Sequence, residues 1–135
     1  MNRVQLILET ALLSGSLLAQ DSPTTPRAAR MRIIQGPTIE LATEYLTIVS
    51  WTTNNPGGSP VHYGIVHYGI SPGRLMESAK SPIRLNPGHS TTVFRVRLDK
   101  LKARTTYYFT VDSIGANGEQ DTVTSPVGHF TTRGE

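Results

Sequence analysis

The sequence predicts an all-β fold, a two-layer antiparallel sandwich of seven strands. Apolar and polar residues alternate in two successive runs between His89 and Ile114, and a period of two is typical of strands with one buried face. Beyond Arg30, turn residues such as Gly, Pro and Asn recur about every eight to twelve residues, as between the short strands of a sandwich. No helical period occurs over that part of the chain.

The first strand is expected at 31–42, where Pro37 cannot donate to a ladder and therefore predicts an edge position. The second strand is expected at 45–53, with Trp51 pointing inward. Apolar residues occupy both of its faces, so either both faces are covered or a bulge shifts the register. The Asn, Pro and Gly residues of 54–60 predict a loop between the sheets.

The third strand is expected at 61–70, where the unit VHYGI is written twice. Because five is odd and side chains alternate along a strand, the two copies cannot present the same residues to one face. We predict that Val66 and Tyr68 face the core and that Val61 and Tyr63 face outward or lie in the loop.

Five further elements flank the two alternating runs: a turn at 71–74 followed by a weak edge strand at 75–80, a turn at 86–88, a hairpin turn at 115–118 and a last strand at 124–132. The last strand has Val127 and Phe130 as its apolar residues, with Pro126 marking an edge or a bulge.

The two alternating runs each put an apolar row on one face and a polar row on the other. In the first run the rows are Phe94, Val96 and Leu98 against Arg95 and Arg97; in the second they are Tyr107, Phe109 and Val111 against Tyr108, Thr110 and Asp112.

The corner between these runs carries three structural residues. Leu101 is expected to plug the core beneath the crossover, and Thr105 to open the second run. Tyr107 can lay its ring over the core while its hydroxyl bonds a backbone group upstream. With Trp51 on an earlier strand, this spacing resembles that of an immunoglobulin-like sandwich.

The Trp and the Leu, Thr and Tyr spacing resemble the fibronectin type III domain, with Ala103 where that pattern usually has Pro. Within that class, SPVHYGIVHYG, His89 and LDKLKARTTYYFTV look most like the non-catalytic N-terminal domain of purple acid phosphatases. The resemblance covers roughly residues 31–133. It implies that only Trp51, Leu101, Thr105 and Tyr107 carry over, all as structural residues, because the family's metal ligands lie in a separate C-terminal domain.

Composition bounds the function further. A chain of 135 residues supports one domain, and 37% hydrophobic with 17% charged residues is typical of a globular protein. The net charge of +3 is too small for the dense basic stripe of a nucleic-acid-binding protein. Without cysteine there is neither a disulfide nor a thiolate metal site.

Residues 1–20 have the outline of a secretory signal peptide, with Arg3 before an apolar stretch that ends at Ala19. A retained amphipathic helix is the alternative. The stretch is too short to span a membrane. Residues 21–30 read as a linker, and 31–133 as the folded domain. We therefore expect a secreted, periplasmic or cell-surface protein.

No catalytic motif occurs, and no cofactor is expected. The four histidines, at positions 62, 67, 89 and 129, are expected to form hydrogen bonds rather than a metal site, because His62 and His67 lie on opposite faces of one strand and no supporting carboxylate is suitably spaced.

Two surfaces are candidates for binding. The first is a run of five cations, in which Asp99 is the one acidic residue. The run could attract a polyanion, or it could be a solvated strand edge. Its members are Arg95, Arg97, Lys100, Lys102 and Arg104. The second is a pair of outward tyrosines, Tyr63 and Tyr108, which could form a sugar-stacking or protein-binding surface or could pack across strands.

These features predict a non-catalytic extracellular binding or spacer module, with an unidentified protein or polysaccharide at the cell surface as partner. Two alternatives stay open. One is a structural subunit that self-assembles through its N-terminal segment or through exposed edges at 75–80 or 124–132. The other is the accessory domain of a truncated protein similar to purple acid phosphatases.

Overall fold

The fold is all-β, as the alternation predicts. The structure, a computed structural model, describes residues 31–118, 120 and 124–134. The signal peptide, helix and linker expected in 1–30 lie outside these residues. The strands of the described part are β2 (Ile33–Ala42), β3 (Thr47–Asn54), β4 (Val61–Gly69), β5 (Glu77–Arg84), β6 (Thr91–Leu98), β7 (Thr106–Gly115) and β8 (Gly128–Thr131).

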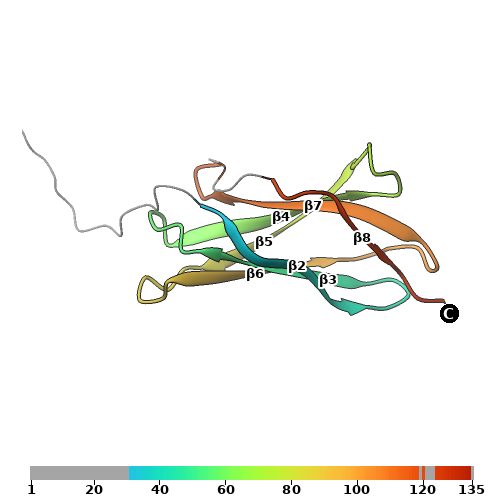
Figure 1. The fold of residues 1–135 in the computed structure, drawn as a ribbon, viewed down its shortest axis with the longest axis horizontal. Helices are drawn as coiled ribbons and strands as arrows, with labels where there is room; N and C mark the ends of the chain where they lie inside the picture. Colours follow the sequence, from blue (N-terminus) through green and yellow to red (C-terminus); the bar gives the residue numbers. More distant parts are fainter. Residues whose placement is uncertain (1–30, 119, 121–123, 135) are drawn as a thin grey trace, which may run out of the picture.

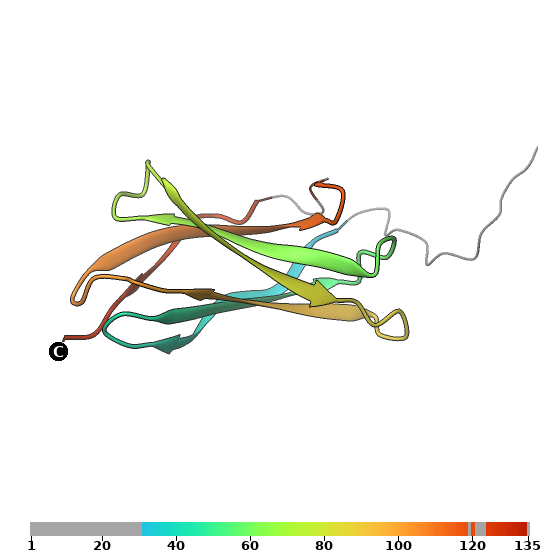
Figure 2. The same cartoon turned by 180° about the vertical axis from the view of Figure 1, so that it is seen from behind.

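The strands form two antiparallel sheets, ordered β2-β3-β6 and β5-β4-β7-β8, stacked as two layers (Figures 1 and 2). The described part of the chain holds no helix long and apolar enough to cross a membrane.

The core lies between the layers. Trp51 is 2% exposed and stacks on Phe94, with ring centroids 5.5 Å apart. A Cβ at Gly64 on the facing sheet would lie 3.1 Å from both rings, so glycine makes this close approach available. Tyr107 is buried and stacks on Phe130, also at 5.5 Å.

The doubled unit VHYGI forms one regular strand, β4. Val66 is fully buried and Tyr68 packs against the core, whereas Val61 and Tyr63 lie on the outer face. The predicted register is confirmed, and its consequence falls on the histidines: His62 points inward and is buried, while His67 is half-buried on the outer face.

Two predicted strand ranges are wrong. The sequence predicts the edge strand at 75–80, but β5 begins at Glu77 and ends at Arg84. It is longer at its C-terminal end because it pairs with β4 from Tyr68↔Glu77 to Val61↔Arg84. The last strand is shorter than 124–132 and leaves Val127 exposed. Before β8, Ser125 forms two hydrogen bonds to β7 in place of regular strand pairing. Its N–H donates to the Val111 carbonyl at 2.9 Å, and its hydroxyl accepts from the Val111 N–H at 2.9 Å.

The sandwich has two ends, set by the strand registers. The corner end holds the turns at 43–46, 70–76 and 99–105, since Thr47 pairs with Leu98 and Gly69 with Tyr108. The loop end holds the turns at 55–60, 85–90 and 116–118, since Asn54 pairs with Thr91.

Candidate binding site at the corner end

The corner between β6 and β7 is held by backbone hydrogen bonds. The Tyr107 hydroxyl accepts from the Lys102 N–H at 2.9 Å, the upstream contact expected of a tyrosine at this position. Leu101 is buried beneath the turn, and its N–H donates to the Tyr45 carbonyl at 3.0 Å. The Thr105 hydroxyl donates to the Ala103 carbonyl at 2.9 Å. The backbone from 101 to 105 is therefore fixed in place.

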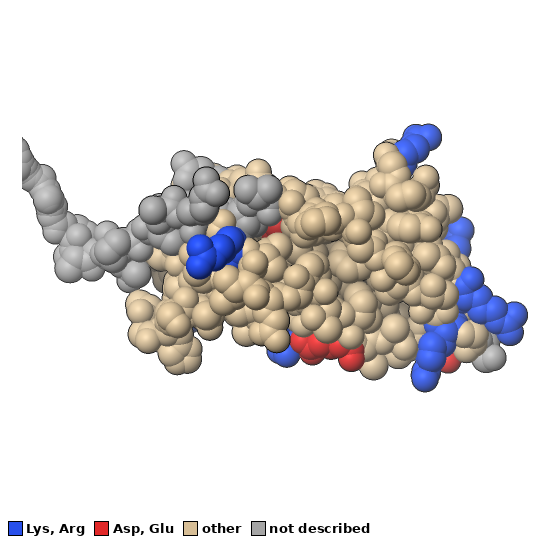
Figure 3. Space-filling model, in the orientation of Figure 1, with Lys and Arg blue, Asp and Glu red and all other residues tan. Residues whose placement is uncertain are grey.

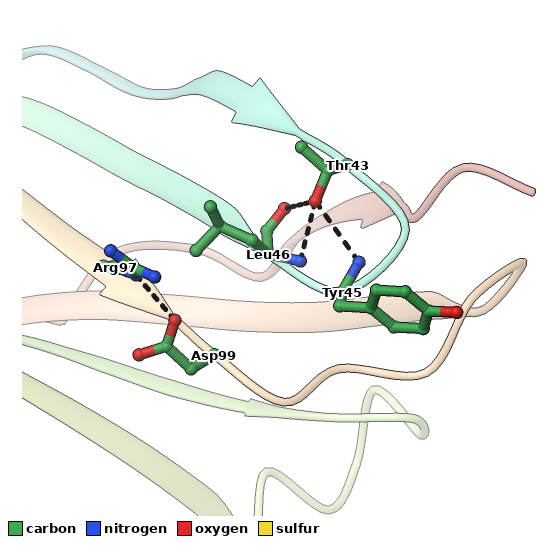
Figure 4. Close-up of polar contacts among 5 residues, drawn as sticks. All are labelled: Thr43, Tyr45, Leu46, Arg97 and Asp99. Carbon is green, nitrogen blue, oxygen red and sulfur yellow. Dashed lines mark hydrogen bonds and ion pairs between the residues drawn. The ribbon is translucent and has the colours of Figure 1, made fainter. Parts of the chain in front are cut away.

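The neighbouring turn at 43–46 supports this corner. The Thr43 hydroxyl oxygen accepts from the Leu46 N–H at 3.0 Å and from the Tyr45 N–H at 3.3 Å (Figure 4). Threonine closes such turns because its hydroxyl can replace a backbone acceptor. The turn thereby orients the Tyr45 carbonyl, which accepts the hydrogen bond from the Leu101 N–H.

Two corner residues have an unfavourable backbone conformation. Lys100 has φ of 58° and Arg104 has φ of 53°, the left-handed region, which costs a residue with a Cβ about 1–2 kcal/mol. Such positions usually hold Gly or Asn. Here both positions hold cationic residues in spite of this conformational free-energy cost. Backbone strain of this kind clusters at functional sites.

An open groove lies between the corner and the turn joining β4 to β5. It encloses about 680 Å³, within the range of small-ligand sites. Its apolar rim is formed by Ile70, which is 64% exposed, and Met76, which is 74% exposed. We call it the corner groove, and its lining is Tyr68, Gly69, Ile70, Ser71, Arg74, Met76, Glu77, Asp99, Lys100, Leu101, Lys102 and Tyr107.

The corner groove carries more positive than negative charge. Arg74, Lys100 and Lys102 line it and form no ion pair with any described residue. Of its two carboxylates, Asp99 is paired with Arg97 at 2.6 Å (Figure 4), which leaves Glu77. Lys and Arg side chains gather at the end of the molecule that carries the C-terminus in Figure 1 (Figure 3).

A phenol forms part of the groove wall. Tyr68 is half-buried, and its ring lies edge-on to the Tyr107 ring, 6.1 Å between centroids. Burial, followed by the charge of Glu77, raises the pKa of Tyr68, so the hydroxyl stays protonated at neutral pH. It donates to no other residue of the described chain and is available to a ligand.

The structure divides the predicted run of five cations, contrary to the expectation that Asp99 alone offsets it. The Arg95 Nε lies 3.0 Å from a Glu40 carboxylate oxygen on β2, and hydrogen bonds from Ser50 and Arg95 lower the pKa of Glu40. Arg97 is paired with Asp99. Both arginines project from the outer face of β6. Only Lys100 and Lys102 of the five line the corner groove, and Arg104 lies outside it.

The predicted tyrosine pair does not form one surface. Tyr63 and Tyr108 lie on neighbouring strands, but Tyr63 pairs with Ile114 and Tyr108 with Gly69. This register separates them by six positions, roughly 20 Å along the sheet. Each has its own neighbour: the Lys80 Nζ lies 5.0 Å above the Tyr63 ring, and the Tyr108 ring lies 6.1 Å from His129. The hypothesis that the two tyrosines form one sugar-stacking surface is therefore wrong.

The histidines have separate surroundings. The His62 Nε2 lies 3.0 Å from the Gly57 carbonyl oxygen, and the His89 Nε2 lies 3.3 Å from the Asn86 side-chain nitrogen. Across residues 31–118, 120 and 124–134, no group of three His, Asp or Glu side chains is placed to hold a metal ion.

Sequence reasoning missed Ile70, Arg74 and Met76 as site residues and placed Tyr68 only in the core. One available indication was the composition of the segment GISPGRLM, in which two large apolar residues flank a Pro-Gly turn. Turns are ordinarily polar, so exposed apolar residues on both sides indicate a contact surface.

The chain is similar to several known domains. The family profile of the purple acid phosphatase N-terminal domain matches residues 38–132. The sensor domain of the anti-sigma factor RsgI4 in Pseudobacteroides cellulosolvens has 18% identity and a TM-score of 0.52, over 78% of this chain and 91% of that one. The fn3 domain of human contactin 1 has 13% identity and a TM-score of 0.49, over 87% and 88% of the two chains. No curated protein sequence matches significantly.

Proposed function

The chain belongs to the family of purple acid phosphatase N-terminal domains, and on this premise we propose that it is a non-catalytic binding module whose binding surface is the corner groove. The single observation that carries the proposal is the composition of that groove. Exposed Ile70 and Met76 lie beside three cations that pair with no described residue. A surface that leaves both apolar area and charge unsatisfied has the features of a recognition site.

The module is proposed to span residues 31–133 and to act outside the cytoplasm. The signal-like residues 1–20 support this placement. The fold likeness to the sensor domain of an anti-sigma factor agrees with a recognition role. Edman sequencing of the protein exported by its native host tests the placement, because a start between Gln20 and Arg30 is expected and retention of Met1 contradicts cleavage.

A second function, as accessory domain of a larger phosphatase-like protein, is favoured by the family match alone. In that case the partner of the groove is another part of the same assembly. Purification of the native protein distinguishes the two functions: an accessory domain co-purifies with phosphatase activity at constant ratio, whereas an independent module separates from it.

The groove proposal is tested by probing the full chain against a mixed array of peptides and glycans. Lys100→Glu with Lys102→Glu should abolish the bound signals, since it reverses two groove charges. Arg84→Glu is the matched control, because Arg84 is exposed at the far end of β5. Ligands that bind both variants equally would place the binding surface elsewhere.

A further inference from the structure

We infer that the ligand of the corner groove is a short acidic peptide segment in which one apolar side chain is flanked by carboxylates. The inference rests on the proposed function and specifies the ligand of that same site. Three features of the groove support it: its apolar rim, its cations and its phenol.

The apolar rim needs a hydrophobic side chain. Met76 and Ile70 have the two highest exposed fractions among the large hydrophobic residues of the described chain. They lie on opposite sides of the turn between β4 and β5 and border the same groove. Methionine is unbranched and polarisable, so it adapts to side chains of different shape. A single apolar side chain placed between Ile70 and Met76 would cover both.

The cations need carboxylates. Lys100 and Lys102 approach the groove from the corner, and Arg74 from the opposite turn. Carboxylates on both sides of the apolar residue would therefore each meet a cation. The backbone beneath Lys102 is anchored by the Tyr107 hydroxyl, which limits the ordering cost on binding.

The Tyr68 hydroxyl adds a directional contact. It is a protonated donor without a partner in the described chain, and a peptide carbonyl or carboxylate can accept from it. A donor that finds its acceptor only in the complex favours ligands with that acceptor over isosteres without it.

The same features disfavour two other polyanions. An acidic polysaccharide would meet the cations but leave Ile70 and Met76 uncovered, and the Tyr68 ring is half-buried and already in contact with the Tyr107 ring. An anionic membrane presents its headgroups as a flat layer, whereas the corner groove is a hollow between two turns. The hollow shape also suits a protruding side chain better than a flat bilayer surface.

The test uses the full chain and fluorescent peptides followed by anisotropy. The probe has one leucine between two pairs of aspartates. One control peptide replaces leucine by serine, and another replaces the aspartates by asparagines. Both controls should bind at least about tenfold more weakly, the effect of losing one anchor contact. Equal binding of the serine peptide would overturn the inference.

Protein variants test the same contacts from the other side. Met76→Ser should weaken the leucine peptide by about fivefold to tenfold and leave the weak binding of the serine peptide unchanged. Ile34→Ser is the matched control, because Ile34 is also an exposed apolar residue but lies at the other end of the molecule. Retention of the near-ultraviolet circular dichroism signal of Trp51 shows that each variant is folded.

Two further probes separate the failure of this inference from failure of the proposed function. A heparin fragment and phosphatidylserine vesicles are titrated against the wild type and the Lys100→Glu, Lys102→Glu variant. If either probe binds through those lysines and no peptide does, the peptide inference is overturned and the proposed function stands. If no probe distinguishes this variant from Arg84→Glu, both are overturned.

Discussion

At the loop end the Asn55 side chain bonds three backbone groups, whereas at the corner end three cationic side chains meet no ionic partner in the described chain. The Asn55 amide nitrogen donates to the carbonyls of Asn86 at 3.0 Å and His89 at 2.9 Å, and its oxygen accepts from the Gly57 N–H at 3.0 Å. The hollow beside it measures only about 80 Å³, against about 680 Å³ for the corner groove.

The difference separates polar groups that stabilise the fold from polar groups that the fold leaves exposed. At the loop end, the polar atoms of the Asn55 side chain are bonded within the molecule and stabilise the turns. At the corner end, hydrogen bonds fix the backbone, while the side chains of Arg74, Lys100 and Lys102 remain in solvent. A fixed backbone that presents unsatisfied side chains is how rigid scaffolds carry binding sites on their turns.

The largest effect on stability is expected from Asn55→Ala. The substitution removes three hydrogen bonds at once, each worth about 1 kcal/mol, so the free energy of unfolding should fall by about 2–3 kcal/mol. Urea unfolding followed by Trp51 fluorescence measures it, with the exposed Gln35→Ala as control. Peptide binding at the corner groove should persist in the folded fraction, and its loss would show that the two ends are not independent.

Tyr107→Phe should have a smaller effect on stability but a clear one on binding. The ring stays in the core, while the Lys102 N–H loses its acceptor, at a cost of about 1–2 kcal/mol. Because this bond anchors the corner, the acidic peptide should also bind more weakly. Tyr108→Phe, which changes the outward neighbour, is the control. Unchanged affinity in Tyr107→Phe would mean that the groove does not depend on the anchor.

The contrast between the ends also explains what the sequence could reveal. Alternation tells which residues of a strand share a face, and so Phe94, Val96 and Leu98 could be placed in the core and Arg95 outside it. Alternation does not tell which strand lies alongside. Glu40, the partner of Arg95, is 55 positions away, and only the pairing of β2, β3 and β6 brings the two together.

The corner groove could not be predicted for the same reason. Its two walls, at 68–77 and 99–107, meet because Gly69 pairs with Tyr108 across β4 and β7. The C-terminal end of β5 could not be predicted either. Pro82 indicates a turn unless the strand is known to lie at a sheet edge, where proline is tolerated.

Asp112 sharpens the comparison, because it is a polar group left incompletely satisfied away from the corner end. It is buried on the outer face of β7, where Thr124 donates to one carboxylate oxygen at 3.2 Å and the other oxygen has no hydrogen bond among the described residues. Burial raises the pKa of Asp112 above its ordinary value of 3.8. The folded state therefore holds this proton more tightly than the unfolded state.

The sign of the pH dependence follows from that difference. As pH rises from about 3.8 through the raised pKa, the unfolded state loses the proton first, and the stability of the fold decreases. Asp112→Asn keeps an acceptor for Thr124 and cannot ionise, so it should be more stable than the wild type at neutral pH by about 1 kcal/mol. The gain should vanish in acid. A gain that is the same at every pH would contradict the raised pKa.

The smallest expected effect, from Lys100→Gly, separates stability from function at a single residue. Glycine removes the left-handed backbone penalty of about 1–2 kcal/mol but adds about 0.5–1 kcal/mol of unfolded-state entropy. The net result should be a gain of about 0.5 kcal/mol or slightly more, visible as a higher urea midpoint. Arg104→Gly should gain a similar amount, because it has the same backbone conformation.

The two substitutions should differ in binding, because Lys100 lines the corner groove and Arg104 does not. Lys100→Gly should therefore weaken the acidic peptide, while Arg104→Gly leaves its affinity unchanged. A lysine that lowers stability and raises affinity is retained for binding, as expected where a strained residue belongs to a functional site. If both variants gain stability and neither loses affinity, the left-handed Lys100 is only a feature of the turn, and the charge of the groove rests on Lys102 and Arg74.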